Sequence, residues 1–439
     1  MATVSIVEVI LRARDEASRV LQGVGKEIEA SAGALKTVGA VSAGAGLAIG
    51  GALGAAVKAA SGFESQMSGV KAVMSPAEVQ EFGGALEQLA LRLGKDTAFS
   101  ATAAAQGIEE LVKAGVPAKL VLQGAGEAAL ALAAAGGVSL PKAAEVASNA
   151  LNAFKIPADQ MGRAVNTLAG AANASASDIG ELQFGMQAAS AVAATVGLTL
   201  EDTAGTLALL SNNALKGSDA GTSLKTMLMN LQPGTKAQNA EFSRLGITTL
   251  QTEKAFGVLA NMVENDANAM KAWERHTKAG TGTLDNLYKV AGNFALVDKD
   301  VDFNKWAFDA GFMGNQFFDA SGKAKSMSDI SGVLAGSLEG MTEQQKLASL
   351  EIMFGSDAVR AAAILSREGA EGFDTMTAAI AKVEAGDVAK TRLDNLAGAT
   401  EAMKGSLETA AIEIGNRIIP TVRILVEQVT GLLNRFLEL

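Results

Sequence analysis

Residues 393–436, LDNLAGATEAMKGSLETAAIEIGNRIIPTVRILVEQVTGLLNRF, decide the fold, because their apolar side chains recur at alternating steps of three and four residues. This spacing keeps one apolar seam on one side of a helix and is typical of coiled coils. The first run of seam positions is Leu393, Leu396, Thr400, Met403, Leu407, Ala410 and Ile414. The second run is Ile418, Val422, Leu425, Val429, Leu432 and Phe436. The stretch therefore predicts the start of a coiled-coil-like rod, and the pattern is still running where the chain ends at Leu439.

The seam has one irregular step and one widening. An extra four-residue step between Ile414 and Ile418 separates the two runs. Such a stutter unwinds a supercoil locally without ending the helix. A second apolar row widens the seam and consists of Ile419, Val426 and Leu433. A wide seam favours more than two strands, or packing against a wall, so we expect a homo-oligomer and favour a trimer, with six copies or a wall-packed single helix left open.

The composition limits both the core and the chemistry. A chain of 439 residues with 49% hydrophobic content is long enough for two or more domains and is not disordered throughout. Because there are 48 glycines and only 4% aromatic residues, we expect a thin core made of close helix contacts. The chain has no cysteine, which excludes disulfides, thiolate metal sites and cysteine nucleophiles. The net charge of −10 argues against sequence-specific binding of nucleic acid, which normally requires a basic patch.

Residues 1–60 are predicted to form a strand and two helices. Residues 3–14, TVSIVEVILRAR, are rich in β-branched side chains and predict a strand. Residues 15–35 predict a helix whose first turn carries the acidic pair Asp15 and Glu16. The stretch Thr37–Val57 has no charged residue, and its glycines form a ridge at four-residue intervals: Gly46, Gly50 and Gly54. This stretch is long enough to cross a bilayer, but glycine and alanine favour a tightly packed helix over a resting transmembrane span; conditional membrane insertion stays open.

Residues 61–251 predict a helical core with recurring start and stop signals. Ser75 and Glu78 form a capping box with a proline at the first helical position. Thr199 with Asp202 is a weaker form of the same signal, and Thr342 with Gln345 repeats it later in the chain. Glycines are placed where helices are expected to stop, at Gly115, Gly136, Gly137, Gly197 and Gly217.

Residues 252–314 differ in composition and predict an inserted subdomain with its own small core. The chain's only histidine, its only tyrosine and both tryptophans lie there, as His276, Tyr288, Trp273 and Trp306. After the insert, Phe317–Gly322 predicts a strand that enters a tight turn. The second part of the helical core is expected at 315–385 and the rod at 386–439. The predicted fold is therefore mainly α, with an Ala/Gly-rich helical core, a short N-terminal strand, a small hairpin and a terminal rod.

No residue pattern indicates catalysis or a bound cofactor. Gly94-Lys95-Asp96-Thr97 fails as a phosphate loop, because Leu89 stands where that loop requires glycine. One weak calcium-like pattern is present, formed by Asp298, Asp300, Asp302, Asn304 and Asp309. Phe303 replaces the glycine of a calcium loop, so a solvated acidic loop is the preferred interpretation. His276 is expected to be a surface or packed residue, because no partner for a catalytic triad stands out.

Several longer stretches share one further feature: FESQM (63–67), LGKDTAFS (93–100), IEELVKAGV (108–116), LEDTAGTLALLSNNALKGS (200–218), GSDAGTSLK (217–225), FFDASGKAKSMSDI (317–330), MTEQQKLASLEIMFG (341–355) and GSDA (355–358). In this order they resemble the core region of the tail tape measure proteins of long-tailed phages and prophages. Within these stretches the positions that carry the resemblance are Gly94, Thr97, Phe99, Ser100, Gly115, Gly217, Gly221, Thr222, Phe354 and Gly355. The ARDEAS stretch and Ile418-Ile419-Pro420 also resemble the family.

The resemblance implies a structural protein rather than an enzyme. Copies are expected to form a rod in the lumen of the tail tube, to set tail length during assembly in the host cytoplasm, and to leave ahead of the DNA at ejection. It implies tail tube subunits, the tail tip or baseplate and tail assembly chaperones as partners, and the host membrane during ejection. Thr37–Val57 is where a membrane-active role is expected.

The resemblance covers residues 1–250 and 315–439, and the segment 252–314 inherits nothing from it. Members of the family are commonly longer, so a truncation, a processed form and an unusually short member remain three interpretations of this chain. A rival from another class is a membrane-active, pore-forming or toxin-like helical protein that inserts its Gly/Ala-rich segment. That rival predicts permeabilisation by the isolated protein without tube subunits.

Overall fold

The computed structural model describes residues 45–279, 282–298, 306 and 313–437, and these are mainly α-helical, as predicted. The chain divides into two compact units: unit 1 is Met1–Asn166 with Glu384–Leu439, and unit 2 is Thr167–Val383. The strand predicted at 3–14 and the helix predicted at 15–35 lie outside the described residues. The domain boundaries drawn from the sequence at 61, 252, 315 and 386 stay predictions.

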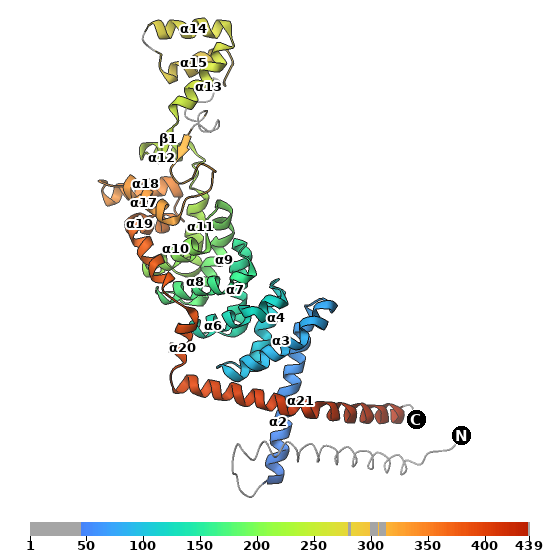
Figure 1. The fold of residues 1–439 in the computed structure, drawn as a ribbon. Coiled ribbons are helices and arrows are strands. Elements are labelled where there is room, and N and C mark those ends of the chain that lie inside the picture. Colours follow the sequence, from blue (N-terminus) through green and yellow to red (C-terminus); the bar gives the residue numbers. More distant parts are fainter. Residues whose placement is uncertain (1–44, 280–281, 299–305, 307–312, 438–439) are drawn as a thin grey trace. The chain divides into compact units, whose positions relative to one another are not determined.

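Unit 1 is built from helices at the two ends of the chain (Figure 1). In chain order they are α2 (Ala45–Ala72), α3 (Pro76–Asp96), α4 (Ala101–Lys113), α5 (Ala118–Leu120), the π-helical turn η1 (Val121–Ala125), α6 (Gly126–Gly136), α7 (Leu140–Phe154), η2 (Ala158–Gln160), the start of α8 (Met161–Asn173), α20 (Ala385–Leu393) and α21 (Leu396–Leu437). Small residues let these helices approach closely: a Cβ added to Gly107 of α4 would lie 2.6 Å from the side chain of Leu140 in α7. The expected core of close helix contacts is therefore found here.

Unit 2 contains the remaining helices and the two strands. In chain order they are the end of α8, α9 (Ile179–Val196), α10 (Leu200–Asn212), α11 (Gly217–Met229), α12 (Lys236–Arg244), β1 (Thr248–Leu250), α13 (Thr252–Glu264), α14 (Ala267–Lys278), α15 (Leu284–Asn293), β2 (Met313–Asn315), α17 (Met327–Ser337), α18 (Glu343–Phe354) and α19 (Val359–Ala381). Three fully buried rings, Phe242, Phe317 and Phe354, pack edge-on or tilted with centroids 5.9–6.4 Å apart. They anchor α12, the turn after β2 and α18 to one another.

The predicted helix starts are confirmed in atomic detail. Ser75, Thr199 and Thr342 each accept the backbone N–H of the third helical residue, whose own side chain accepts the N–H of the cap. These reciprocal bonds satisfy amides that a helix N-terminus leaves without intrahelical partners.

The predicted helix stops are confirmed at Gly115, Gly137 and Gly197, which adopt positive φ angles of 89°, 66° and 99°. At each, the following apolar residue donates its N–H to a carbonyl in the last turn, as in Val116 to Leu111 at 3.0 Å. Gly217 was predicted to end a helix, and this is wrong: α10 ends at Asn212, Ala214 takes the left-handed conformation, and Gly217 begins α11.

The predicted hairpin is only partly correct. The tight turn exists at Asp319–Gly322, with one antiparallel bridge between Phe318 and Ala324 around it. The regular pairing, however, joins β1 to β2, with Leu250 opposite Met313 and Thr248 opposite Asn315. The sequence signal at Phe317–Gly322 was strong because turn chemistry is local, whereas the pairing of β1 with β2 closes a long loop that leaves no local pattern.

Candidate assembly surfaces

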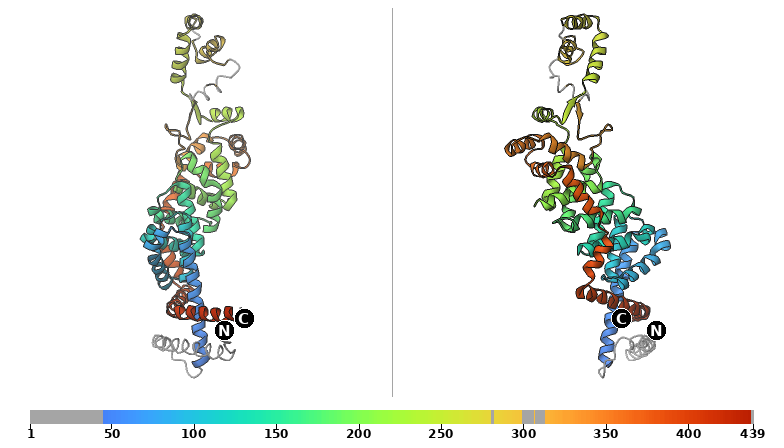
Figure 2. Two further views of the ribbon diagram at one scale, coloured as in Figure 1. Left: turned by 90° about the vertical axis from the view of Figure 1, so that its right-hand side faces the viewer. Right: turned by 60° about the vertical axis from the view of Figure 1, so that its left-hand side comes forward.

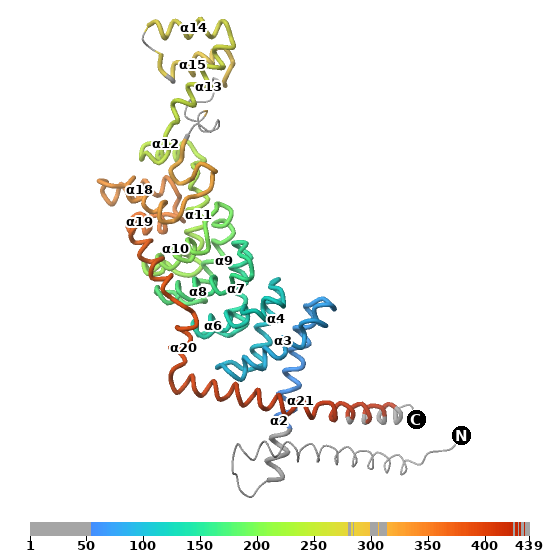
Figure 3. Tube along the Cα trace, viewed as in Figure 1, coloured from blue at the N-terminus to red at the C-terminus, as the bar shows by residue number. Residues whose placement is uncertain are grey.

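The long helix within the rod predicted at 386–439 begins at a sharp turn between α20 and α21, which the Cα trace shows clearly (Figure 3). Asn395 makes this turn: its side-chain oxygen accepts the N–H of Gly398 at 3.0 Å and its backbone carbonyl accepts the N–H of Ala399 at 2.9 Å. Asn395 is thus the N-cap of α21, an element of 42 residues that runs to Leu437. The predicted coiled-coil-like stretch is one helix from Leu396 onward, whereas its first seam position, Leu393, ends α20 before the turn.

The loop between α3 and α4 forms a seat for α21. A Cβ at Gly405 of α21 would lie 2.6 Å from the carbonyl oxygen of Phe99 and 3.0 Å from that of Gly94. Gly94 itself is pressed against Ala101, with a Cβ–N distance of 2.4 Å for an added Cβ. Backbone-to-backbone approach of this kind is open only to glycine. The LGKDTAFS motif therefore has a structural task, which is to hold the helix that carries the seam.

Side-chain hydrogen bonds fix the shape of this seat. Thr97 donates from its hydroxyl to the carbonyl of Leu93 at 2.7 Å and accepts the N–H of Phe99 at 3.2 Å. Ser100 caps α4 by accepting the N–H of Ala103. From the other side, the hydroxyl of Ser406 in α21 donates to the carbonyl of Lys95 at 2.9 Å. Thr97 and Ser100, which carry the family resemblance, thus shape the loop rather than a ligand site.

Helix α2 crosses α21 ten residues further on, as Figures 1 and 2 show from three directions. A Cβ at Gly415 would lie 2.3 Å from the carbonyl oxygen of Ala56 and 2.4 Å from the Cβ of Ala60. An ion pair between Arg423 and Glu64, 2.5 Å apart, ties the two helices beyond the crossing. Two glycines, Gly405 and Gly415, therefore attach α21 to the rest of unit 1.

A groove of about 550 Å³ runs beside this crossing. Its apolar lining comes from Phe63 and Met67 of α2 and from Ile419, Pro420 and Ile424 of α21. Proline has no N–H, so Pro420 removes one intrahelical hydrogen bond of α21 at this point. The Ile418-Ile419-Pro420 passage that resembles the family thus lies at the α2 crossing.

The side-chain exposure of the predicted seam residues changes along α21. Leu396, Met403 and Leu407 are 85%, 57% and 52% exposed, which is unusual for side chains of their size. Ile414 and Val422 are half-buried, and Ile418 is only 4% exposed. The backbone of Leu425, Val429, Leu432 and Phe436 continues the helix, but their side chains lie outside the described set. The chain therefore leaves the first part of the seam open and covers it at Ile418.

In unit 2, two of the motifs that resemble the family meet each other. Ser223, in GSDAGTSLK, donates its hydroxyl to the carbonyl of Asp357 at 2.8 Å and accepts the N–H of Ala361 at 3.2 Å. Helix α19 has Ala358 as its N-cap, which offers no side-chain acceptor. Ser223 therefore caps α19 from a distant part of the sequence, and Asp357 belongs to the GSDA stretch that starts at Gly355.

The other motif positions of unit 2 are packing and turn residues. A Cβ at Gly221 would lie 2.3 Å from the carbonyl oxygen of Gly185, so α11 and α9 touch backbone to backbone. Phe354 is fully buried in the aromatic trio, and Gly355 ends α18 with a φ of 83°. Thr222 is half-buried on α11. None of these positions forms a pocket with a nucleophile or a metal-binding set.

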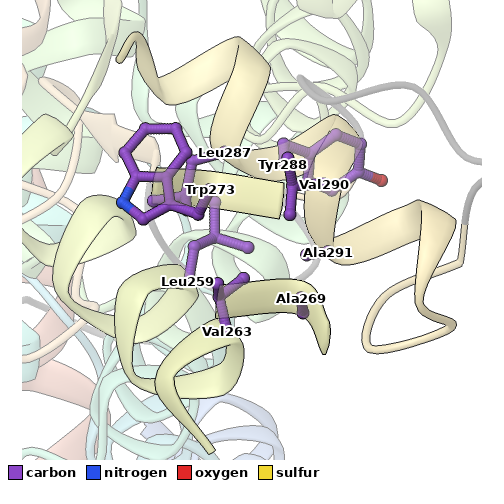
Figure 4. Packing of buried hydrophobic residues seen from close by; sticks show 8 residues of the cluster. All are labelled: Leu259, Val263, Ala269, Trp273, Leu287, Tyr288, Val290 and Ala291. Atoms are coloured by element: carbon purple, nitrogen blue, oxygen red, sulfur yellow. The ribbon is translucent and has the colours of Figure 1, made fainter. Parts of the chain in front are cut away.

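Residues of the predicted insert form a small core of their own (Figure 4). Its buried members are Leu259, Val263, Ala269, Trp273, Leu287, Tyr288, Val290 and Ala291. His276 is half-buried and stacks on Trp273, with ring centroids 6.4 Å apart. This placement agrees with a packed histidine.

The calcium-like pattern is described only at Asp298, which is exposed and whose backbone carbonyl accepts a hydrogen bond from the Tyr288 hydroxyl. The other members of the pattern, Asp300, Asp302, Asn304 and Asp309, lie outside the described residues. Within the described part of the chain, no cluster of three or more histidine, aspartate or glutamate side chains is arranged to hold a metal ion.

The Gly/Ala-rich stretch Thr37–Val57 is described only from Ala45, where α2 begins. Gly46 and Gly50 belong to α2, and a Cβ at Gly54 would meet no atom within 4 Å. The packed positions of α2 are instead Ala56 and Ala60. Among the described residues, one stretch, Ala118–Gly136, has the length and composition of a membrane span. That is weak evidence, since half of it is buried and core helices pass the same test.

Sequence patterns did not reveal Gly405, Gly415, Asn395 or Ser223. Each acts on a segment that is distant in sequence or at a turn inside an apparently continuous pattern. Gly405 and Gly415 do carry one usable signal: they are glycines inside a long helix, where glycine is unfavourable unless a close approach requires it.

Comparison with known proteins agrees with this picture. The chain is similar to the tape measure protein of Pneumococcus phage Dp-1, with 27% identity over 390 residues that cover 88% of this chain and 28% of the relative. It is also similar to the probable tape measure protein of Escherichia phage P2, with 30% identity over 245 residues, or 54% of this chain and 29% of the relative. The chain thus spans less than a third of the length of these relatives. No solved structure matches it. Residues 87–355 match the phage-related minor tail proteins, and the chain belongs to that family.

Proposed function

We propose that this chain is the core and rod base of a phage tail tape measure protein, which sets the length of the tail tube during assembly. The observation that carries the proposal is the exposed, heptad-spaced stripe on α21, with Leu396 85%, Met403 57% and Leu407 52% exposed. Apolar side chains at this spacing form the seam of a coiled coil, and a second copy of the same helix carries a matching seam. The names of the two relatives support the tail role, although the match covers less than a third of either relative.

The structure of unit 1 suits a protein from which a rod of associated helices begins. The seat at Phe99 and Gly94 and the crossing at Ala56 hold one side of α21 through Gly405 and Gly415. Around a helix with 3.6 residues per turn, Gly405 lies about 160° from Leu407. The attachment to the core and the open stripe are thus on opposite sides of the first half of α21, so copies can associate there without displacing the seat.

The proposed partners are further copies of the chain and the components of a phage tail. We propose the lumen of the tail tube as its place in the virion, with tube subunits, the tail tip or baseplate, and assembly chaperones as partners. A trimer is the proposed state, since the seam is wider than that of a dimer. The acidic net charge of −10 suits a protein that shares the tube with DNA and must not adhere to it.

The tail role is favoured over the pore-forming or toxin-like alternative. The family match and both relatives belong to phage tails. A membrane-active role for Thr37–Val57 during ejection stays a proposal of its own. Partitioning of a peptide of these residues into liposomes, compared with a Gly46→Leu, Gly50→Leu variant, tests whether the glycine ridge matters; a peptide that stays in the aqueous phase removes the idea.

Tail length tests the main proposal directly. An α-helix rises about 1.5 Å per residue, so inserting four heptads after Val422, 28 residues in all, is expected to lengthen the tail by about 42 Å. Tails of the phage that encodes this chain are measured by electron microscopy, with enough particles to resolve the shift of the mean. The insertion keeps the seven-residue register, so the seam is not disturbed.

The matched control places the same 28 residues after Ala279, at the end of α14. This site is exposed and lies in the segment that differs from the family pattern. Tail length is expected to stay unchanged there. Equal tail lengths for the wild type and the Val422 insertion would reject the ruler function.

A further inference from the structure

The stutter in the seam lies where α2 crosses α21. The extra four-residue step runs from Ile414 to Ile418, and Gly415, which meets the backbone of Ala56, lies within it. Pro420 follows in the next turn of the helix. A break in a coiled-coil pattern that coincides with an intrachain crossing indicates that the seam changes its partner there.

The exposure of the seam residues supports this change of partner. At about 100° per residue, Leu407, Ile414 and Ile418 lie within about 40° of one another around α21 and share one face. Leu407 is nevertheless 52% exposed and Ile418 only 4%. Because the face is the same, the difference arises from what lies against it. The face that α2 brings to the crossing is buried throughout, with Ala56, Ala60, Phe63 and Met67 each at most 3% exposed.

The second apolar row, at its first residue Ile419, also packs beside α2. Ile419 lines the groove with Phe63 and Met67 of α2. The ion pair between Glu64 and Arg423 closes the crossing one turn later. The widened seam, which alone favours a third strand or a wall, is thus used at Ile419 by a helix of the same chain.

We infer that α2 divides the copy-to-copy seam into two segments. A second copy of this chain binds the stripe from Leu396 to Ala410 and the seam beyond Val422, whereas α2 of the same chain occupies Ile418 and Ile419 in the assembly as it does in the single chain. This inference rests on the proposed self-association and adds where the copies touch. It assigns to α2 the role of a fixed third partner at the base of the rod.

The 439 residues contain no cysteine, so each introduced thiol is the only one in the chain and every disulfide in the scan involves the chosen position. The variants are Leu407→Cys, Ile418→Cys and Leu425→Cys, each oxidised with copper phenanthroline and resolved on a non-reducing gel. Leu407→Cys and Leu425→Cys are expected to link copies at least tenfold faster than Ile418→Cys. Ile418→Cys linking copies as fast as Leu407→Cys would overturn the inference while leaving self-association intact.

A second measurement does not depend on how well a buried thiol reacts. In the variant Glu64→Cys, Arg423→Cys, a short bismaleimide joins α2 to α21 at the exposed ends of the ion pair, and light scattering gives the mass of the assembly. The joined chain is expected to associate as the unjoined chain does. A joined chain that stays monomeric while the unjoined one associates shows that α2 must leave, which overturns the inference. Chains that stay monomeric in every state, with no links at Leu407 or Leu425, would reject the proposed self-association itself.

Discussion

At the scale of single residues, loss of the small Ser223 side chain should lower the free energy of unfolding more than its size alone suggests. Its hydroxyl supplies the acceptor that the N-terminus of α19 lacks and also binds the carbonyl of Asp357. Ser223→Ala is expected to lower the free energy of unfolding by about 1–2 kcal/mol, as for the loss of a helix cap. Ser218→Ala is the matched control, because Ser218 is exposed on α11, the helix that also carries Ser223. It should change the free energy of unfolding by less than about 0.5 kcal/mol. Equal effects in urea denaturation would contradict the capping role.

Residue-scale features could be predicted from the sequence where the chemistry is local. Ser75, Thr199 and Thr342 cap their own helices through a partner three residues ahead, so spacing alone reveals them. Ser223 caps a helix that begins more than a hundred residues later, and nothing in its neighbourhood indicates this. The failure at Gly217 has a similar origin, because its left-handed φ of 56° suits either end of a helix.

At the scale of elements, the turn after β2 should make the stability of unit 2 sensitive to acid. The pKa of Asp319 lies below its ordinary value of 3.8, because its carboxylate accepts hydrogen bonds from the Ser321 hydroxyl and from the backbone amides of Lys323, Ser321 and Gly322. A lowered folded pKa means that folding favours the charged form, so the stabilisation is fully present above 3.8 and is lost as the pH falls through the lower folded value.

Thermal unfolding of Asp319→Asn across this range checks the sign. The wild type is expected to have the higher midpoint at neutral pH, and the difference is expected to shrink below about pH 4. Asp374→Asn removes a charge from an exposed position of α19 and serves as the control. A difference between wild type and Asp319→Asn that grows toward low pH would be incompatible with this account.

The pair β1 and β2 predicts that the segment between them can be removed. Leu250 and Met313 lie opposite each other at the end of the sheet, and opposite Cα atoms in antiparallel strands are about 5 Å apart. Replacing residues 251–312 by Asn-Gly, the preferred two-residue hairpin turn, is expected to leave the rest of unit 2 folded. The aromatic trio of Phe242, Phe317 and Phe354 lies outside the deletion.

Cooperative thermal unfolding of the shortened chain, followed by circular dichroism, measures the outcome. Phe242→Ala in the shortened chain shows how a damaged core behaves. It should lower the free energy of unfolding by about 3–5 kcal/mol. A shortened chain that unfolds without a transition, even with Phe242 intact, would show that the segment supports the fold.

Elements were predictable to the extent that their partners were near in sequence. The heptad spacing identified α21 as one long helix, because the apolar pattern repeats within that helix. The crossing by α2 was not predictable, since it depends on Ala56 and Ala60 meeting Gly415 across more than three hundred residues. The second apolar row was interpreted as a sign of additional strands or a wall, and at Ile419 the observed neighbour is α2.

At the scale of the whole molecule, the central prediction is that copies of the chain associate through the open stripe of α21. Leu407 of that stripe and Leu347 of α18 are nearly equally exposed, at 52% and 53%, so they form a matched pair. Leu407→Lys places a charge in an interface that excludes water, which is unfavourable unless the charge is paired. It is expected to weaken association at least tenfold, or about 1.4 kcal/mol, in sedimentation of the 439-residue chain. Leu347→Lys changes a surface of similar exposure outside the seam and should leave the assembly unchanged. If both variants sediment like the wild type, the stripe is not where copies meet, and the rod must be built from another face.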